Sequence, residues 1–177
     1  QDNFYKHNPD AHLKVYNFDN FEKEIKGWFK KPAAMMDAAK LANKVCWLDT
    51  DCEVKDNLND IWSYTSSNRL SMAEDVPWSK RRSEKWHNSG VVLFKSYPNI
   101  LPKWANACKT NPQVGDQEVL HDIVKDEMKR MIHISDLPRE YNTLRLDILD
   151  KSQPKNIKIM HWTGRKGKKH IRSMIND

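Results

Sequence analysis

The most informative segment of this sequence is Val45-Cys46-Trp47-Leu48-Asp49-Thr50-Asp51-Cys52-Glu53-Val54. It begins as an apolar run of strand length and ends in two carboxylates, Asp49 and Asp51, which are two residues apart. A buried strand that ends in acidic residues delivers them to the edge of a sheet, where α/β folds bind their ligands. Residues two apart on an extended chain point the same way, so these carboxylates can share one cation. We therefore expect a metal site that holds an anionic group.

The residues before this stretch predict the unit to which its strand belongs. His12–Phe18 alternates apolar and polar positions, as a half-buried strand does, and Phe21–Ile25 reads as a short helix. Lys31-Pro32 then opens a run of strong helix formers, Ala33–Leu41, with the proline at the favoured first turn. A strand, a helix and a second strand in succession are typical of a βαβ unit in a parallel sheet.

The rest of the chain continues this mixture of helices and strands. Apolar runs predict strands at residues 70–73, 90–94, 131–134 and 157–160. Helical spacing predicts helices at residues 55–62, at residues 98–108 and after Gly115. The polar, basic residues 74–84 predict a mobile loop. The fold class predicted is α/β, with a mixed, mostly parallel sheet and helices on both faces.

The composition suits a soluble globular enzyme of one domain. The chain has 177 residues, of which 38% are hydrophobic and 31% charged. We expect no transmembrane segment, because no apolar run reaches the roughly 18 residues that a spanning helix needs. The three cysteines, Cys46, Cys52 and Cys108, lack metal-ligand spacing, which favours a reducing compartment and a cytoplasmic location.

The formal net charge of +6 is unevenly distributed along the chain. One basic cluster is Lys80-Arg81-Arg82, and a second covers residues 165–172. Such clusters favour polyanions, diphosphates or anionic membrane surfaces as partners. A solvated face that only keeps the protein soluble is the alternative interpretation, and charge alone leaves both open.

Several short segments resemble one family of enzymes. Leu48-Asp49-Thr50-Asp51, followed by Asp56-x-Leu58 and Ile61-Trp62, resembles the DxD segment of GT-A glycosyltransferases, whose aspartates hold a divalent cation on a nucleotide-sugar diphosphate. Five further segments are similar to those of glycosyltransferase family 8 and its relatives, and they occur in the same order: Lys31-Pro32, Asn88-Ser89-Gly90-Val91-Val92-Leu93-Phe94, Asp116-Gln117-Glu118, Leu137-Pro138 with Tyr141-Asn142, and His161-Trp162-Thr163-Gly164-Arg165-Lys166. Their common order indicates a single GT-A, Rossmann-like domain over residues 1–177.

The resemblance implies a role for each matched residue. Asp49, Asp51 and His161 would hold the metal, and a histidine among carboxylates suits Mn²⁺ (or Mg²⁺) better than an all-oxygen Ca²⁺ site. The donor-binding residues implied are Lys31, Asn88, Gly164 and Lys166, and the catalytic residues implied are Asp116 and Gln117. Each has a structural alternative: an Asx turn for Asn88, a helix N-cap for Asp116, a surface position for Lys31 and a structural role for His161.

The sequence also departs from the family pattern. Gly167-Lys168 stands where the family usually has Pro-Trp, in the segment that closes over the diphosphate. The first strand of the GT-A fold, which usually contacts the base, has no clear counterpart before His12. Either the sequence begins after that strand or the base is held differently.

The function predicted is metal-dependent transfer of a sugar from a nucleotide diphosphate, expected to be a UDP-sugar, to a hydroxyl acceptor such as a glycan. The resemblance favours retention of the anomeric configuration. Two alternatives stay open. One is a nucleotidyltransferase or other metal-dependent phosphoryl-transfer enzyme, which also uses paired aspartates. The other is a nucleic-acid-binding module, or sugar transfer onto a polyanionic acceptor, as the basic clusters suggest.

Overall fold

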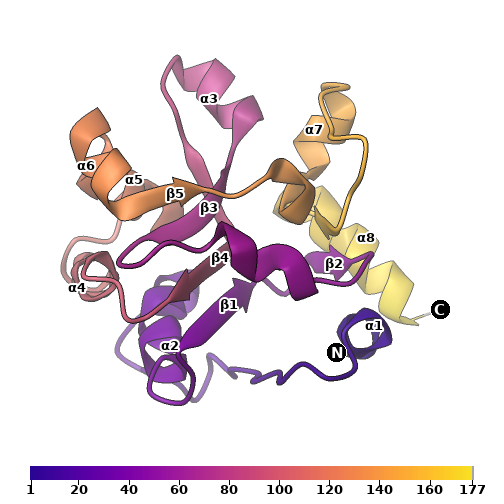
Figure 1. Ribbon diagram of the computed structural model, residues 1–177, viewed down its shortest axis with the longest axis horizontal. Helices are drawn as coiled ribbons and strands as arrows, with labels where there is room; N and C mark the ends of the chain where they lie inside the picture. The colour runs from indigo at the N-terminus through magenta and orange to yellow at the C-terminus, as the bar shows by residue number, and fades with distance from the viewer. Residues whose placement is uncertain (177) are drawn as a thin grey trace.

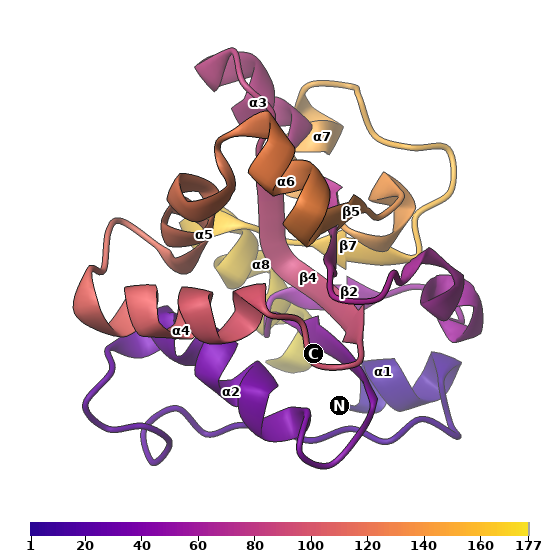
Figure 2. The same cartoon turned by 60° about the vertical axis from the view of Figure 1, so that its left-hand side comes forward.

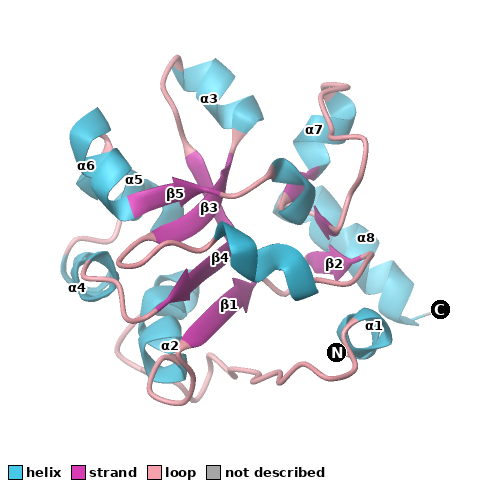
Figure 3. Ribbon diagram, viewed as in Figure 1, coloured by secondary structure: helices cyan, strands magenta, loops and turns pink. Residues whose placement is uncertain are grey.

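The computed structural model describes residues 1–176 and contains two β-sheets with helices packed around them (Figure 1, Figure 3). The four-stranded sheet has the order β1-β4-β3-β5 and the three-stranded sheet the order β2-β7-β6. The strands are β1 Lys44–Leu48, β2 Cys52–Val54, β3 Leu70–Glu74, β4 His87–Lys95, β5 Ile134–Asp136, β6 Thr143–Leu144 and β7 Ile159–His161. The predicted domain ends at Asp177, which lies outside the described residues.

Helices and 3-10 helices connect these strands. The α-helices are α1 Asp2–His7, α2 Lys31–Ala38, α3 Val76–Arg82, α4 Ile100–Thr110, α5 Asp116–Val124, α6 Glu127–His133, α7 Arg145–Leu149 and α8 Gly164–Asn176. The 3-10 helices are η1 Gly27–Lys30, η2 Asn59–Tyr64 and η3 Arg139–Tyr141. The mixed α/β fold class predicted from the sequence is confirmed.

The pairing in the larger sheet differs from the prediction. β4 pairs antiparallel with both β1 and β3, and only the β3–β5 pair of this sheet is parallel. The prediction of a mostly parallel sheet is therefore wrong. A strand buried on both faces reads as a continuous apolar run whichever way its neighbours point, so the sequence pattern does not reveal strand direction.

The central strand β4 separates two apolar cores. Its side chains alternate between the two faces of the sheet, as successive residues of a strand do. Val92 and Phe94 pack into the core formed with helices α2, α4 and α5, whereas Val91 and Leu93 pack into a second core. That second core lies under η2, η3 and the smaller sheet, so α-helices cover one face and shorter elements cover the other (Figure 2).

Two N-terminal elements predicted from the sequence are absent. Residues 12–18 form extended coil rather than a strand, and residues 21–25 form turns rather than a helix. The end of this segment packs without pairing to a sheet: Tyr16 and Phe18 lie against the ring of Trp47, with ring centroids 6.4 Å and 6.0 Å away, whereas Val15 is exposed. The Tyr16 hydroxyl also donates a hydrogen bond to Asp37 in α2 at 2.9 Å.

Two later predictions are also wrong, and in both an N-cap explains the helix that forms. The predicted mobile loop at 74–84 contains α3, because Asp75 accepts a hydrogen bond from Trp78 N at 3.0 Å. The predicted strand at 131–134 is mostly α6, whose N-cap Asp126 accepts from Lys129 N at 3.0 Å, and β5 begins only at Ile134. The helix opened by Lys31-Pro32, the strands at 45–48, 70–73 and 90–94, and the helices at 98–108 and after Gly115 are confirmed within a few residues.

Candidate active site

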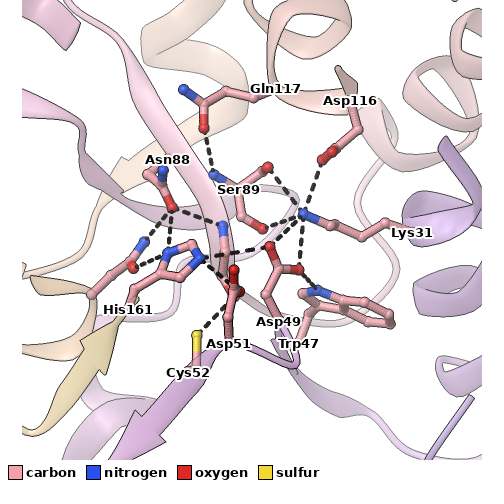
Figure 4. A network of polar contacts seen from close by, with 12 residues as sticks. Lys31, Trp47, Asp49, Asp51, Cys52, Asn88, Ser89, Asp116, Gln117 and His161 are labelled. Carbon is pink, nitrogen blue, oxygen red and sulfur yellow. Dashed lines mark hydrogen bonds and ion pairs between the residues drawn. The ribbon is translucent and has the colours of Figure 1, made fainter. Parts of the chain in front are cut away.

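A group of polar side chains gathers where β1 ends and β4 begins (Figure 4). Antiparallel pairing places Leu48 opposite Val91, so the residues after β1 meet the first residues of β4 at one edge of the sheet. The start of α2, the start of α5 and the end of β7 reach the same place. These elements bring together seven of the nine predicted site residues: Lys31, Asp49, Asp51, Asn88, Asp116, Gln117 and His161.

Lys31 lies at the centre of one half of the site. Its ammonium is 3.0 Å from Asp49 Oδ1 and 3.1 Å from Asp116 Oδ2. It also donates hydrogen bonds to the carbonyl and hydroxyl oxygens of Ser89, at 3.0 Å and 3.1 Å. The side chain is only 4% exposed, so Lys31 is a buried group and not a surface lysine.

Charge and burial act on this half of the site in opposite directions. Burial by itself lowers the pKa of Lys31, but Asp116 and Asp49 outweigh it, so the pKa lies above its ordinary value and the group stays an ammonium. Burial raises the pKa of Asp116, and the ammonium of Lys31 opposes that rise. A buried carboxylate and a buried ammonium that face each other stabilise each other's charge. Removal of either partner leaves the other charge buried and unpaired.

Asp49, Asp51 and His161 form the other half. Donor atoms from these three side chains all lie within 4.8 Å of one another. His161 Nε2 is 3.1 Å from Asp51 Oδ1 and 3.9 Å from Asp49 Oδ2. Burial raises the pKa of Asp51, but the hydrogen bond and charge of His161 exceed it and leave the pKa below its usual range. One nitrogen and two carboxylate groups at this spacing fit a divalent transition-metal ion.

The orientation of the imidazole is fixed by two amides. His161 Nδ1 is 3.1 Å from Asn88 Oδ1 and 3.1 Å from Asn142 Oδ1, and both are acceptors. Nδ1 therefore carries a hydrogen, so Nε2, which faces the aspartates, is the nitrogen that could ligate a metal. A ligating histidine is usually held in this way by an acceptor behind the ring.

Gly90 provides the space that the imidazole occupies. A β-carbon at this position would lie 1.9 Å from His161 Cε1 and 2.3 Å from Nδ1. Only glycine can stand in β4 beneath the ring, so the glycine of the Asn-Ser-Gly segment has a steric role. The cradle for His161 is thus built into the strand itself.

Asp75 joins the site to α3. Its Oδ1 caps α3, whereas its Oδ2 accepts hydrogen bonds from Asn88 Nδ2 at 3.2 Å and from Gln117 Nε2 at 3.3 Å. Because a carboxylate can only accept, it orients the Asn88 amide with Oδ1 toward His161. Gln117 Oε1 in turn accepts from Ser89 N at 3.2 Å.

Two predicted residues lie apart from this network. Gly164 and Lys166 are exposed in the first turn of α8, and within residues 1–176 no hydrogen bond or ion pair involves the Lys166 ammonium. Gly164 has a φ of 77°, which favours glycine at the turn between His161 and α8. Lys168 on the same helix is the cation whose charge contributes, after burial and His161, to the pKa of Asp51.

Four residues of the network were not nominated from the sequence. Ser89 and Asn142 belong to segments that carried the family resemblance, so the resemblance could have identified them as candidates. Trp47, whose Nε1 donates to Asp49 Oδ1 at 2.7 Å, read only as a strand residue. Asp75 fell in a stretch interpreted as a loop and had no signal. Asp116 is the first residue of α5, and Gly115 occupies the N-cap position suggested for it.

The part of the chain that the structure describes contains no helix long and apolar enough to cross a bilayer.

Several solved structures have a similar fold. A glycosyltransferase involved in glycosylation of the major capsid of PBCV-1 matches with a TM-score of 0.59 and 14% identity, over 90% of this chain and 81% of that one. The galactosyltransferase LgtC, crystallised with donor and acceptor sugar analogs, matches with a TM-score of 0.53 and 15% identity, over 92% of this chain and 64% of LgtC. GlyE of Streptococcus pneumoniae TIGR4 matches with a TM-score of 0.56 and 22% identity, over 79% of this chain. The match covers only 38% of the length of GlyE. Identities this low show the fold alone.

Comparison with curated protein sequences found no match. A family profile does match, from residue 3 to residue 174, and so covers nearly the whole chain. Its range includes both halves of the site, from Lys31 to His161. The protein belongs to the nucleotide-diphospho-sugar transferase family.

Proposed function

We propose that this protein is a metal-dependent glycosyltransferase that moves a sugar from a nucleotide diphosphate, a UDP-sugar, to a hydroxyl acceptor. The observation that carries the proposal is the convergence of Asp49, Asp51 and His161 within 4.8 Å at the edge of the sheet. Family membership supports a nucleotide-diphospho-sugar as the donor. UDP as the nucleotide and retention of configuration rest on the resemblance to glycosyltransferase family 8, in which Asp49-Thr50-Asp51 corresponds to the DxD segment.

The residues present fit a divalent cation, Mn²⁺ or Mg²⁺. Asp49 Oδ1 accepts from Trp47 and is 3.0 Å from the Lys31 ammonium, and Asp49 Oδ2 accepts from Lys31 at 3.2 Å and lies 3.9 Å from His161 Nε2. Together with Asp51 and the Nε2 lone pair, this oxygen would complete a ligand set of two carboxylates and one imidazole. The ion would act as a Lewis acid that neutralises the charge on the departing nucleoside diphosphate.

The remaining residues act on the sugar and the phosphates. During transfer the bond from the anomeric carbon to the diphosphate oxygen breaks, and a bond to the acceptor oxygen forms while the acceptor hydroxyl loses its proton. Asp116 and Gln117, in the first turn of α5, would orient the donor sugar beside that carbon. Lys31 would supply fixed positive charge there, and Gly164 and Lys166 would approach the diphosphate from α8.

Asn88 takes a different part from the one first expected. Its amide already contacts Asp75, Gly90, Asn142 and His161, at distances from 2.9 to 3.2 Å. These contacts support a positioning role, in which Asn88 affects the donor through the orientation of His161.

The test is hydrolysis of a panel of nucleotide sugars with and without Mn²⁺. Asp51→Asn should abolish Mn²⁺-dependent hydrolysis, and Asp56→Asn, the same change at an exposed position five residues on, should not. UDP and Mn²⁺ together should raise Tm more than either alone, because ligands that bind only the native state stabilise it. If Asp51→Asn hydrolyses the donor at the native rate and with the same dependence on Mn²⁺, the metal lies elsewhere.

A further inference from the structure

Two basic clusters follow segments that carry residues of the candidate site, and the proposed donor accounts for one of them. The α3 cluster is Lys80, Arg81 and Arg82, and the α8 cluster is Arg165, Lys166, Lys168, Lys169 and Arg172. All eight residues are exposed, and among the described residues none of them forms an ion pair. Their charges are therefore available to a ligand.

The α8 cluster lies on the metal side. α8 begins three residues after His161, and the charge of Lys168 reaches Asp51. A diphosphate held at Asp49, Asp51 and His161 would meet this cluster. The donor therefore gives a sufficient reason for the positive charge of α8.

The α3 cluster lies on a different side of the site. α3 follows Asp75, and the Oδ2 of Asp75 is bonded to Gln117 at 3.3 Å and to Asn88 at 3.2 Å. The base of α3 is thus attached to the wall that carries Gln117, the side proposed for the sugar. α3 projects beyond the sheet, contacts α7 and lies apart from α8 (Figure 1).

One member of the α3 cluster, Arg82, is held in place by packed rings. Arg82 lies over the ring of Trp78, 4.9 Å from its centroid, and Trp78 meets Trp86 edge-on at 6.2 Å. Trp86 stacks on His121 of α5 with ring centroids 3.5 Å apart. A charge held by a chain of packed rings, as that of Arg82 is, loses less conformational freedom on binding than a charge on a mobile loop would.

We propose that the α3 cluster binds an anionic group of the acceptor, so that the acceptor is an acidic glycan bearing a carboxylate or phosphate near the hydroxyl that receives the sugar. The inference rests on the proposed function, because it treats the sugar side of the site as the acceptor side. Charge complementarity supports it: three adjacent exposed cations, none of which has an acidic partner within residues 1–176, follow Asp75 on the sugar side. A helix of seven residues suits one or two anionic groups rather than the long phosphate track of a nucleic acid.

The test uses two matched variants of the full chain with Mn²⁺ and UDP present. Lys80→Gln with Arg81→Gln removes two exposed charges from α3 and leaves Arg82 on Trp78. Lys103→Gln with Lys109→Gln removes two exposed charges from α4, on a distant part of the molecule (Figure 1). The probes are a fluorescent tetrasaccharide containing glucuronic acid, its carboxyl-reduced neutral form, and the neutral form with a terminal phosphate.

The acidic probes should bind the unaltered protein more tightly than the neutral probe. The α3 variant should weaken acidic binding about fivefold, as expected for two exposed charges, and the α4 variant by less than about twofold. The weakening by the α3 variant should shrink as the salt concentration rises above about 0.1 M, because the Debye length is about 10 Å there and shorter at higher salt. Preference for carboxylate or for phosphate identifies the anionic group, and either preference supports the proposal.

Equal binding of the neutral and acidic probes would overturn the proposal, and so would equal weakening of acidic binding by the two variants. A third contrary result would be that a single-stranded oligonucleotide of the same charge binds more tightly than the acidic probes and that the α3 variant abolishes this binding. Donor hydrolysis separates this inference from the function beneath it. If hydrolysis stays Mn²⁺-dependent in the α3 variant while acidic probes show no preference, the acceptor inference fails and the proposed function stands. If no nucleotide sugar is hydrolysed by the unaltered protein, the proposed function fails.

Discussion

The imidazole of His161 occupies the position that a side chain at Gly90 would need, with Cε1 1.9 Å from where a β-carbon would stand. Gly90→Ala should therefore displace the ring, weaken Mn²⁺ binding and destabilise the protein by about 1–3 kcal/mol through overpacking. Isothermal titration with Mn²⁺ and urea unfolding measure the two effects.

Gly115→Ala is the control for that substitution. Its β-carbon would meet the flexible end of Glu118, at 2.7 Å from Oε2, so the neighbour can move aside. We expect near-native Mn²⁺ affinity for this variant. Equal affinities for the two alanine variants would contradict the steric role of Gly90.

Lys31→Met should be strongly destabilising. Removal of the ammonium leaves Asp49 and Asp116 facing each other without a counter-charge in a buried place, at a cost of about 3–5 kcal/mol. Adding Asp116→Asn should recover part of that loss, since it removes one of the uncompensated charges. Urea unfolding of the two single variants and the double variant tests the coupling. Lys14→Met, which breaks the solvent-exposed pair with Asp37, should change the free energy of unfolding far less.

Asp75→Asn should lower Mn²⁺ affinity about 10- to 100-fold, although Asp75 is not proposed as a ligand. The amide has one acceptor oxygen where the carboxylate has two, so it cannot both cap α3 and accept from Asn88 and Gln117. When its oxygen caps α3, the Asn88 amide loses its fixed orientation. The ¹⁵N shifts of His161 in the metal-free protein should then show loss of a single Nδ1-protonated form. Asp126→Asn changes the N-cap of α6 in the same way and provides the control. An unchanged tautomer in Asp75→Asn would mean that the orientation of His161 does not depend on Asp75.

The stability of the protein should fall above about pH 8.5 because of Cys108. Burial raises the pKa of this thiol to about 12, whereas the unfolded thiol ionises near about 8.5. The stabilisation is complete below the unfolded pKa and is lost as pH rises toward 12, because the unfolded state then binds fewer protons than the native state. The slope is about 1.4 kcal/mol per pH unit for one such group. Urea unfolding under reducing conditions from pH 8 to 10.5 should show a slope smaller by this amount in Cys108→Ala, and identical slopes would exclude Cys108 as the cause.

The sequence predicted which residues gather at the candidate site better than it predicted the contacts that orient them. Asp49 and Asp51 follow an apolar strand, and His161 ends another, so position at a strand end was a usable signal. Asp75 had no such signal, because its role depends on two hydrogen bonds to residues 13 and 42 positions away. Strand direction was wrong for a related reason: an apolar run such as β4 records burial on both faces but not the direction of its neighbours.

Local patterns also failed where tertiary contacts replaced secondary structure. The alternation of residues 12–18 suits a strand, yet Tyr16 and Phe18 use it to pack against Trp47 without pairing to a sheet. Conversely, caps at Asp75 and Asp126 start helices in segments that propensity assigned to a loop and a strand. A single capping hydrogen bond, worth about 1 kcal/mol, is enough to decide such short segments.

The amide oxygen of Asn88 has a consequence for how the molecule can change. It lies 2.9 to 3.1 Å from donors on Gly90, Asn142 and His161, and so links the four-stranded sheet to the three-stranded one. The two sheets cannot separate without dismantling the candidate site, and the site cannot open without loosening the sheets. Local unfolding that exposes His161 should therefore coincide with exchange of the Gly90 amide. Substitutions around the proposed metal site would have to preserve the hydrogen bonds that join the two sheets at the same time.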